Sequence, residues 1–370
     1  MRFLKRWIAP IITIITVEWL LIQLLEFLVG KDDFFLNEQT LFFKSYILFS
    51  IGIVLYLLWV VILIKYDYYI LKKKKLTEKL IDSININKND SLSLILSNAY
   101  NEKRWSEVIK IGNQLSEPLW YTGKFHLRIK IGELVASAAA FENKYDIQAE
   151  TLIDDLGWTN CRLNNQSEAK KNITLGHRIA KKIDNQYLIA KANRHFADIS
   201  LLNKNFDECL NFLKISYSSM RLIENSTKKI EMNGNLQYTI SKFYLAKKNF
   251  KKAIKAANQS QLLYKSIEDS DREVKLFNLK GKIFLSVDKE EDAISSFQEG
   301  LTLATHISNI VNIVSNSSSL AECYLRNKRY DIAKSTIEIA KQNSKAMDDP
   351  ILIEKIEKLS KEIDEKLQSK

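Results

Sequence analysis

The side chains that most often carry enzyme chemistry or hold metal ions are scattered along this sequence. Its three cysteines, Cys161, Cys209 and Cys323, form no CxxC pair, and its four histidines form no HExxH motif. Zinc sites need such ligands at short, fixed spacings, and a catalytic nucleophile needs a neighbouring base that a third group orients. The sequence predicts none of these. We therefore expect no catalytic residues, no metal site and no cofactor, and a protein that is not an enzyme.

The composition favours an all-α protein. The chain of 370 residues contains 10 Gly and 3 Pro, whereas average usage would give about 26 and 18. Turns between strands depend on these two residues, so their scarcity argues against a β-sandwich, a barrel or a Rossmann-type sheet. The Gly-rich motifs of phosphate-binding loops are absent from the sequence. The widely spaced cysteines are typical of reduced thiols in a cytosolic compartment.

Two apolar segments predict a membrane hairpin at the N-terminus. Residues 8–29 contain two carboxylates, and the segment 45–65 has no charge before Lys65. About 20 apolar residues in a helix cross the hydrocarbon core of a bilayer. A signal peptide is the alternative for the first segment, but its apolar run is too long and a second span follows. We expect a membrane anchor over residues 1–71, with an outside loop at 30–44, and a basic linker over 72–90.

The positions of the lysines and arginines set the expected orientation. Basic residues precede the first span and follow the second, and the connecting loop is mainly acidic. The positive-inside rule then places both the N- and C-termini in the cytoplasm, so the expected localisation is the cell (cytoplasmic) membrane, multi-pass. Lys72, Lys73, Lys74 and Lys75 suit anionic lipid headgroups. An ordinary stop-transfer flank explains these lysines equally well.

Glu18 lies in the middle of the first predicted span, and Tyr56 would lie at a similar depth in the second. An intramembrane carboxylate is costly and is a candidate functional residue. Bonding of a protonated Glu18 to Tyr56, or to Glu18 of another subunit, would lower that cost. A functional Glu18 would belong to a polar seam through which a homo-oligomer forms, to a proton path or to a pore. The alternative is a neutral Glu18 that packs against its hairpin partner.

The remainder of the chain repeats a helical pattern. A small residue is followed three positions later by an aromatic and nine positions after that by Ala, as in Gly281, Phe284 and Ala293. The last position recurs at 169, 209, 253, 293 and 333, in steps of 40, 44, 40 and 40. Small residues at these points allow two antiparallel helices to approach closely. A recurring unit of this length is typical of an α-solenoid.

This pattern resembles the tetratricopeptide repeat (TPR) family, which has small residues and an aromatic at the same relative positions. The resemblance covers residues 91–347 and is clearest over 150–347, although the units are longer than the 34 residues of the family. It implies an all-α fold in which a TPR-like α-solenoid follows the two-helix transmembrane hairpin. Residues 348–370 have the apolar and charged faces of a C-terminal capping helix, with a short coiled coil as the alternative.

The resemblance also implies a binding site, because the first helices of TPR pairs line a concave groove. Mapping the family's groove positions onto this sequence gives a mostly basic stripe with two aromatics. Its expected residues are Trp158, Arg162, Lys191, Arg194, Tyr238, Lys242, Lys275, Asn278, Lys282 and Arg326. Such a stripe suits a protein partner that presents an acidic peptide or a C-terminal carboxylate. A solvated surface of a lysine-rich protein is the alternative.

We do not expect nucleic acid as the ligand, although the formal net charge is +11. Outside the stripe, basic residues are interleaved with acidic ones. The sequence therefore predicts a non-enzymatic, membrane-tethered scaffold that recruits a cytoplasmic protein. The alternative hypothesis is a signal-responsive membrane effector, in which the array is the sensor and the hairpin oligomerises through Glu18.

Overall fold

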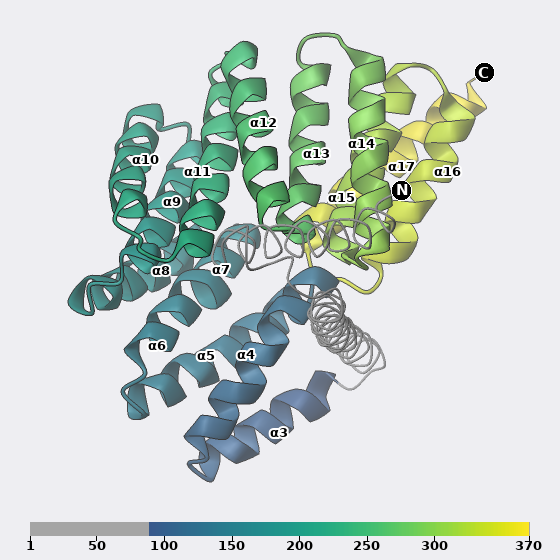
Figure 1. Ribbon diagram of the computed structural model, residues 1–370. Helices are drawn as coiled ribbons and strands as arrows, with labels where there is room; N and C mark the ends of the chain where they lie inside the picture. Colours follow the sequence, from purple (N-terminus) through teal and green to yellow (C-terminus); the bar gives the residue numbers. More distant parts are fainter. Residues whose placement is uncertain (1–88, 370) are drawn as a thin grey trace, which may run out of the picture. The chain divides into compact units, whose positions relative to one another are not determined.

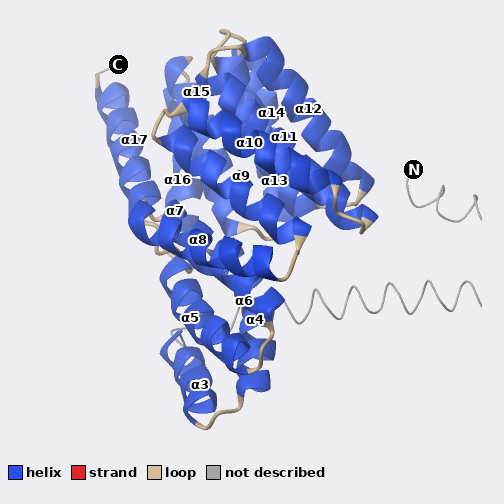
Figure 2. Ribbon diagram, turned by 90° about the vertical axis from the view of Figure 1, so that its left-hand side faces the viewer, coloured by secondary structure: helices blue, strands red, loops and turns tan. Residues whose placement is uncertain are grey.

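The structure is a computed structural model and describes residues 89–369. Over this range the chain is helical and contains no strand (Figures 1 and 2). The helices are α3 (Asn89–Asn101), α4 (Trp105–Thr122), α5 (Phe125–Phe141), α6 (Tyr145–Thr151), the π-helix η1 (Leu152–Trp158), α7 (Thr159–Arg162), α8 (Gln166–Lys182), α9 (Gln186–Leu202), α10 (Phe206–Arg221), α11 (Ser226–Ala246), α12 (Phe250–Ser266), α13 (Ser270–Leu285), α14 (Glu290–His306), α15 (Ile310–Arg326), α16 (Tyr330–Ser344) and α17 (Pro350–Gln368).

Consecutive helices pack as antiparallel pairs, and the small residues of the repeat lie where the paired helices meet. Ala253, Ala293 and Ala333 have no exposed surface. At Gly281 a Cβ atom would lie 2.4 Å from the Phe297 ring, so no larger residue fits without a shift. The predicted all-α repeat architecture is confirmed. Longer helices account for the longer repeat, since α12, α14 and α15 each have 17 residues.

The turns between helices use side-chain-bearing residues in the left-handed conformation. Ten residues other than Gly have φ between 51° and 61°, among them Asn164, Asp184 and Lys204, while Gly123 is the one described glycine with positive φ. The next helix often begins with an Asn cap, as where Asn205 Oδ1 accepts a hydrogen bond from the Glu208 amide. The chain thus forms its turns with very little Gly.

The array closes on itself, because the turn between α4 and α5 contacts the connection between α16 and α17. The Phe125 amide donates to Asp348 Oδ1 at 2.7 Å, and the Asp348 amide donates to the Gly123 carbonyl at 3.0 Å. Phe125 is fully buried in the core of the C-terminal repeats. Arg162 adds a two-pronged ion pair with Asp349, at 3.0 Å and 2.9 Å. We call this set of contacts the ring closure.

The predicted localisation in the cell membrane is contradicted and is corrected here. Among residues 89–369, none of the helices combines the length and the apolar character that crossing a membrane requires. The predicted spans at 8–29 and 45–65 lie outside the described residues, as do Glu18, Tyr56 and Lys72 to Lys75. The expected lipid contact and hairpin oligomer depended on those residues, and nothing in the described part supports them.

Candidate functional site

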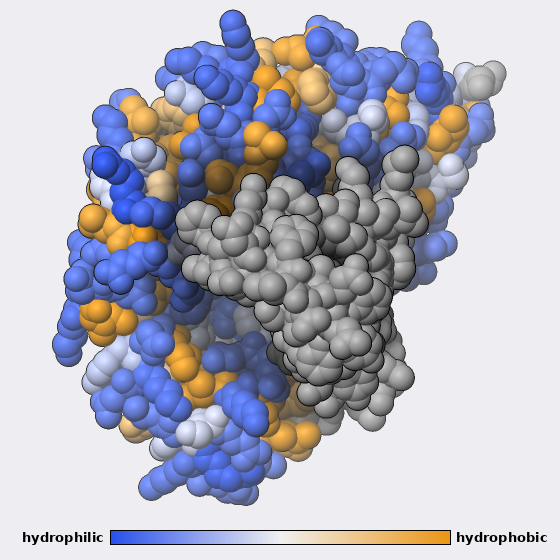
Figure 3. Space-filling model, in the orientation of Figure 1, coloured by the Kyte–Doolittle hydropathy of each residue, from blue (hydrophilic) through white to orange (hydrophobic). Residues whose placement is uncertain are grey.

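A cavity of about 650 Å³ lies among the inner helices, by which we mean α4, the continuous helix of α6, η1 and α7, and α9, α11 and α13. Arg128 of α5 also lines this cavity, whereas α7 contributes no lining residue. We call it the central cavity. Aromatic side chains in its wall include Trp120, Tyr121, Trp158 and Tyr187, and most of the other lining residues are charged or polar. Figure 3 shows that hydrophilic side chains also dominate the visible described surface, with hydrophobic patches scattered among them. Helices that are far apart in the sequence, such as α4 and α13, both contribute to its wall.

A π-helical segment shapes one wall of the cavity. In the segment Leu152–Trp158 the backbone hydrogen bonds span five residues instead of the four of an α-helix, so the helix is locally wider. A Cβ at Gly157 would lie 2.9 Å from the Leu152 carbonyl oxygen and 2.4 Å from Ile173, so glycine is needed where this turn meets α8. Asp154 and Asp155 of this segment both line the cavity. Such π segments are rare and are frequent at functional sites.

Asp154 is the centre of one buried ionic network. Its carboxylate accepts from Lys191 Nζ at 2.7 Å and from His195 Nε2 at 3.0 Å. Burial alone would raise the pKa of Asp154, but Lys191 and His195 together hold it well below the ordinary value. Burial, reinforced by the Arg194 charge, lowers the pKa of His195 to about 4. His195 is therefore a neutral donor to Asp154 at pH 7.

Asp198 is the centre of a second network, and its side chain is 1% exposed. Its carboxylate forms ion pairs with Arg194 Nη1 at 2.9 Å and with Lys242 Nζ at 2.7 Å. Burial alone would raise the pKa of Asp198, but these two cations outweigh burial and lower it. Arg194 and Lys242 belong to the predicted basic stripe, and both pair with Asp198, whose single negative charge offsets one of the two.

Lys275 is partly buried and differs from Arg128, Lys191 and Arg194, the buried cations that line the cavity. No carboxylate of the described residues lies within ion-pair distance of its ammonium, which is 4.8 Å from the Tyr238 ring centroid and 5.6 Å from that of Tyr264. Its hydrogen-bond acceptor is Asn235 Oδ1, at 3.4 Å. Burial first, and then the charges of Arg272 and Arg194, lower the pKa of Lys275 to about 7. The cavity therefore contains one partly buried ammonium, that of Lys275, without a carboxylate of the described residues paired to it.

The wall formed by α4 and the start of α13 is acidic. Tyr121 and Asp271 lie together in this wall, and the charge of Glu117 raises the pKa of the Asp271 carboxyl, although burial is the larger cause. Arg272, the next residue of α13, pairs with Glu231 at 2.9 Å. The cavity thus has an acidic side on α4 and α13, with the uncompensated Lys275 one helical turn further along α13.

The predicted groove residues do not form one continuous stripe but lie at four different places in the structure. Trp158, Lys191, Arg194 and Lys275 line the central cavity, and Tyr238 and Lys242 lie beside it through their contacts with Lys275 and Asp198. Arg162 belongs to the ring closure. Asn278 is buried and donates to the Ser315 carbonyl and the Ser319 hydroxyl, both at 3.1 Å. Lys282 and Arg326 line a different depression, between α13 and α15 near α17.

Sequence reasoning missed the acidic half of the site. The mapped groove positions included Asp154 and Asp198, but these were not identified as partners of the basic stripe. His195, Tyr121 and Asp271 were not identified as site residues at all. One signal was present, because Arg194 and Asp198 are spaced i, i+4 on one helix. The three cysteines are buried, and burial raises the pKa of Cys161, Cys209 and Cys323 to about 11, 12 and 11. Thiols with such pKa values are protonated at pH 7 and are weak nucleophiles.

Comparisons with known proteins relate the chain to others by fold. The Rap protein complexed with Competence and Sporulation Factor is similar with a TM-score of 0.51 and 12% identity, over 82% of this chain and 87% of that one. A STAND protein with a tetratricopeptide repeat sensor from Pyrococcus horikoshii has a TM-score of 0.44 and 16% identity, over 75% and 42%. BtubC from P. vanneervenii has a TM-score of 0.43 and 12% identity, over 56% and 89%.

No family model matches the chain, and no curated protein matches its sequence. The likeness to the Rap protein is one of fold. Together with the repeat geometry of α8 to α16, it identifies the described residues as a TPR-like α-solenoid. The resemblance expected from the sequence is confirmed at this level.

Proposed function

We propose that this TPR-like solenoid binds a segment of a partner protein in its central cavity and anchors an anionic group of that segment at Lys275. The observation that carries the proposal is the partly buried ammonium of Lys275, which has no paired carboxylate among the described residues, in a cavity where the buried cations Arg128, Lys191 and Arg194 each have one. Aromatic and polar walls of this kind are typical of binding sites. The protein is then a binding scaffold and not an enzyme.

An anionic group is the ligand chemistry that best fits Lys275. Partial burial without a countercharge costs free energy, and an incoming carboxylate or phosphate would remove that cost by forming a charge-assisted hydrogen bond. The neighbouring Arg194 and Arg272 add positive potential at the same point. Since the pKa of Lys275 is about 7 in the empty cavity, an anionic ligand binds better below pH 7 and loses this attraction as the pH rises.

The fold comparison is compatible with this proposal. The Rap protein, which has a similar fold, has been crystallised in complex with Competence and Sporulation Factor. The thiol chemistry also favours binding over catalysis, because the three cysteines are buried and have raised pKa values. The alternative of a membrane effector depended on Glu18, and no contact among the described residues favours it.

Reversing the charge of Lys275 should abolish partner capture. We would purify the tagged full chain from its own cells and quantify the proteins that accompany it by mass spectrometry. The Lys275→Glu variant should lose a set of proteins that the wild type retains, because a glutamate repels the anionic group. The same set should be recovered better at pH 6.5 than at pH 8.

Lys255→Glu is the matched control, since Lys255 is an exposed residue of α12 outside the cavity. It makes the same change in net charge and should keep the partner set. Circular dichroism would show that both variants remain folded. Equal capture by the wild type and a folded Lys275→Glu variant would refute the proposed function.

A further inference from the structure

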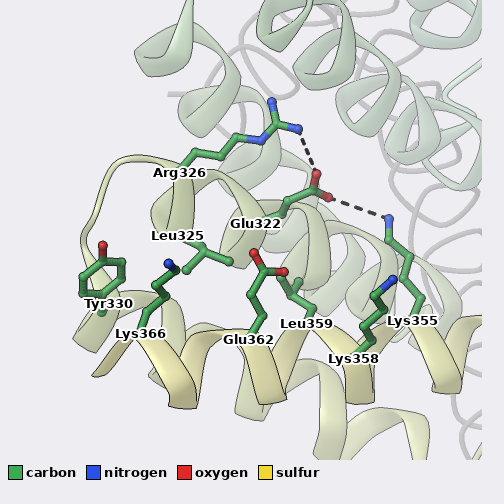
Figure 4. A pocket seen from close by; sticks show the side chains of 9 residues that line it. All are labelled: Glu322, Leu325, Arg326, Tyr330, Lys355, Lys358, Leu359, Glu362 and Lys366. Carbon is green, nitrogen blue, oxygen red and sulfur yellow. Dashed lines mark hydrogen bonds and ion pairs between the residues drawn. The ribbon is translucent and has the colours of Figure 1, made fainter. Parts of the chain in front are cut away.

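A second depression, outside the central cavity, lies between α15 and α17. Figure 4 shows its lining, and its volume is about 500 Å³. Helix α17 packs mainly on α16 and touches α15 only lightly, so the space between α15 and α17 is not filled. Leu325 of α15 and Leu359 of α17 form an apolar floor, and Tyr330 stands at one end. We call this depression the C-terminal groove.

Positive charge dominates the rim of the C-terminal groove. Arg326, Lys355, Lys358 and Lys366 line it, against the two carboxylates Glu322 and Glu362. One of these carboxylates is already engaged, because Glu322 pairs with Arg326 at 3.1 Å and with Lys355 at 3.8 Å (Figure 4). Among the described residues, Lys358 and Lys366 form no ion pair. The groove therefore presents ammonium groups to solvent above an apolar floor.

The positive charge continues into an adjoining depression of about 330 Å³. That depression shares Glu322, Arg326 and Lys355 with the groove and adds Lys282 and Leu285 of α13. Partial burial of its ammonium, followed by the charges of Lys355 and Arg162, lowers the pKa of Lys282 to about 8. No carboxylate of the described structure pairs with Lys282. The two depressions thus form one continuous basic surface with leucines along its floor.

We propose that the C-terminal groove docks an acidic, amphipathic segment of a partner protein. Carboxylates of the segment pair with the lysines of α17 and with Lys282, and its apolar side chains cover Leu325 and Leu359. Charge complementarity selects the acidic partner. The leucine floor favours a peptide over nucleic acid, because apolar side chains of a peptide can cover the leucines and the phosphates of a nucleic acid cannot. The groove and the central cavity share no lining residue, so this inference does not depend on the proposed function.

The test uses a fluorescein-labelled helical peptide of glutamate and leucine, with leucines spaced on one face, and the full protein chain. Fluorescence anisotropy should detect binding of this peptide and none of its twin in which lysine replaces glutamate. The double variant Lys355→Glu/Lys358→Glu should bind the acidic peptide about tenfold more weakly or worse, because each change replaces an attraction by a repulsion.

The control is the double variant Lys251→Glu/Lys255→Glu, which makes the same charge change at two exposed positions of α12. It should bind as the wild type does. The proposal is wrong if the α17 variant binds as tightly as the wild type, if both double variants weaken equally, or if a short DNA duplex displaces the peptide at lower concentration than the unlabelled peptide itself. Thermal unfolding midpoints close to that of the wild type would establish that each variant is folded.

Discussion

Replacing Asp198 by Asn should lower the free energy of unfolding by about 3 kcal/mol, because it leaves the buried Arg194 and the partly buried Lys242 without their shared carboxylate. Arg194 and Lys242 converge on Asp198 from α9 and α11, and the Arg194 side chain is 10% exposed. Because the Asn side chain has nearly the same shape as Asp, the loss of unfolding free energy measures the missing charge and not a change in packing volume. Urea unfolding at pH 7, followed by circular dichroism, measures it.

The matched control for Asp198 is Asp292→Asn, at an exposed position 3.8 Å from Lys289. Exposed pairs contribute little, so this variant should stay within about 0.5 kcal/mol of the wild type. A loss at Asp198 no larger than the loss at Asp292 would show that the buried network does not hold the inner helices.

The Asp198 effect should depend on pH in a defined direction. The pKa of Asp198 is lowered in the folded protein, so its ionised form contributes stability above the unfolded pKa of about 3.9. That contribution is lost as the pH falls through the lower folded value. The difference between wild type and Asp198→Asn should therefore be complete at pH 7 and shrink in acid.

The second large effect is expected at Asp349, where α17 begins and the ring closes. Asp349 Oδ1 accepts a hydrogen bond from the Leu352 amide at 3.1 Å. Asp349 Oδ2 pairs with Arg162 Nε at 3.0 Å and with Arg162 Nη2 at 2.9 Å. Asp349→Ala removes a helix cap, about 1 kcal/mol, and charge-assisted bonds of similar or larger size. Since Arg162 is partly exposed and can be hydrated, we expect a total loss of about 2 kcal/mol.

Hydrogen exchange should show which helices are destabilised by Asp349→Ala. If Asp349 holds the ring closed, amides of α4 and α5 should lose protection in Asp349→Ala more than amides of α11 and α12. Asp269→Ala is the control, because Asp269 also caps a helix and pairs with an arginine, Arg272, within a single repeat. It should destabilise the chain without selective exchange in α4 and α5. Equal exchange patterns in the two variants would contradict a role for Asp349 in closure.

The repeat fold was predictable because its cause is local. Alanine or cysteine recurs about every 40 residues, and each of these side chains is buried between paired helices, as Ala253, Cys209 and Ala293 show. Such close contacts leave a periodic trace in one sequence. The turns left a weaker trace, because Lys204 or Asp184 in the left-handed conformation looks like an ordinary polar residue.

The site was less predictable because its parts come together only in the folded array. The groove positions placed Lys275 and Arg194 correctly in the cavity wall. They did not show that Arg194 pairs with Asp198 and Lys191 with Asp154, so that much of the predicted basic stripe is engaged in ion pairs. Tyr121 meets Asp271 across about 150 positions of sequence, and this contact follows from the superhelical turn of the whole array. No local pattern specifies that turn.

Photo-crosslinking from inside the cavity tests most directly whether the partner binds there. A photoreactive benzoylphenylalanine would replace Asn113, an exposed residue that lines the cavity, or Leu262, a 69% exposed residue of α12 that does not. After illumination in cells, we expect a crosslink to the partner from position 113 and none from position 262. A crosslink from position 262 alone, or the same crosslink from position 113 in a Lys275→Glu background, would contradict it.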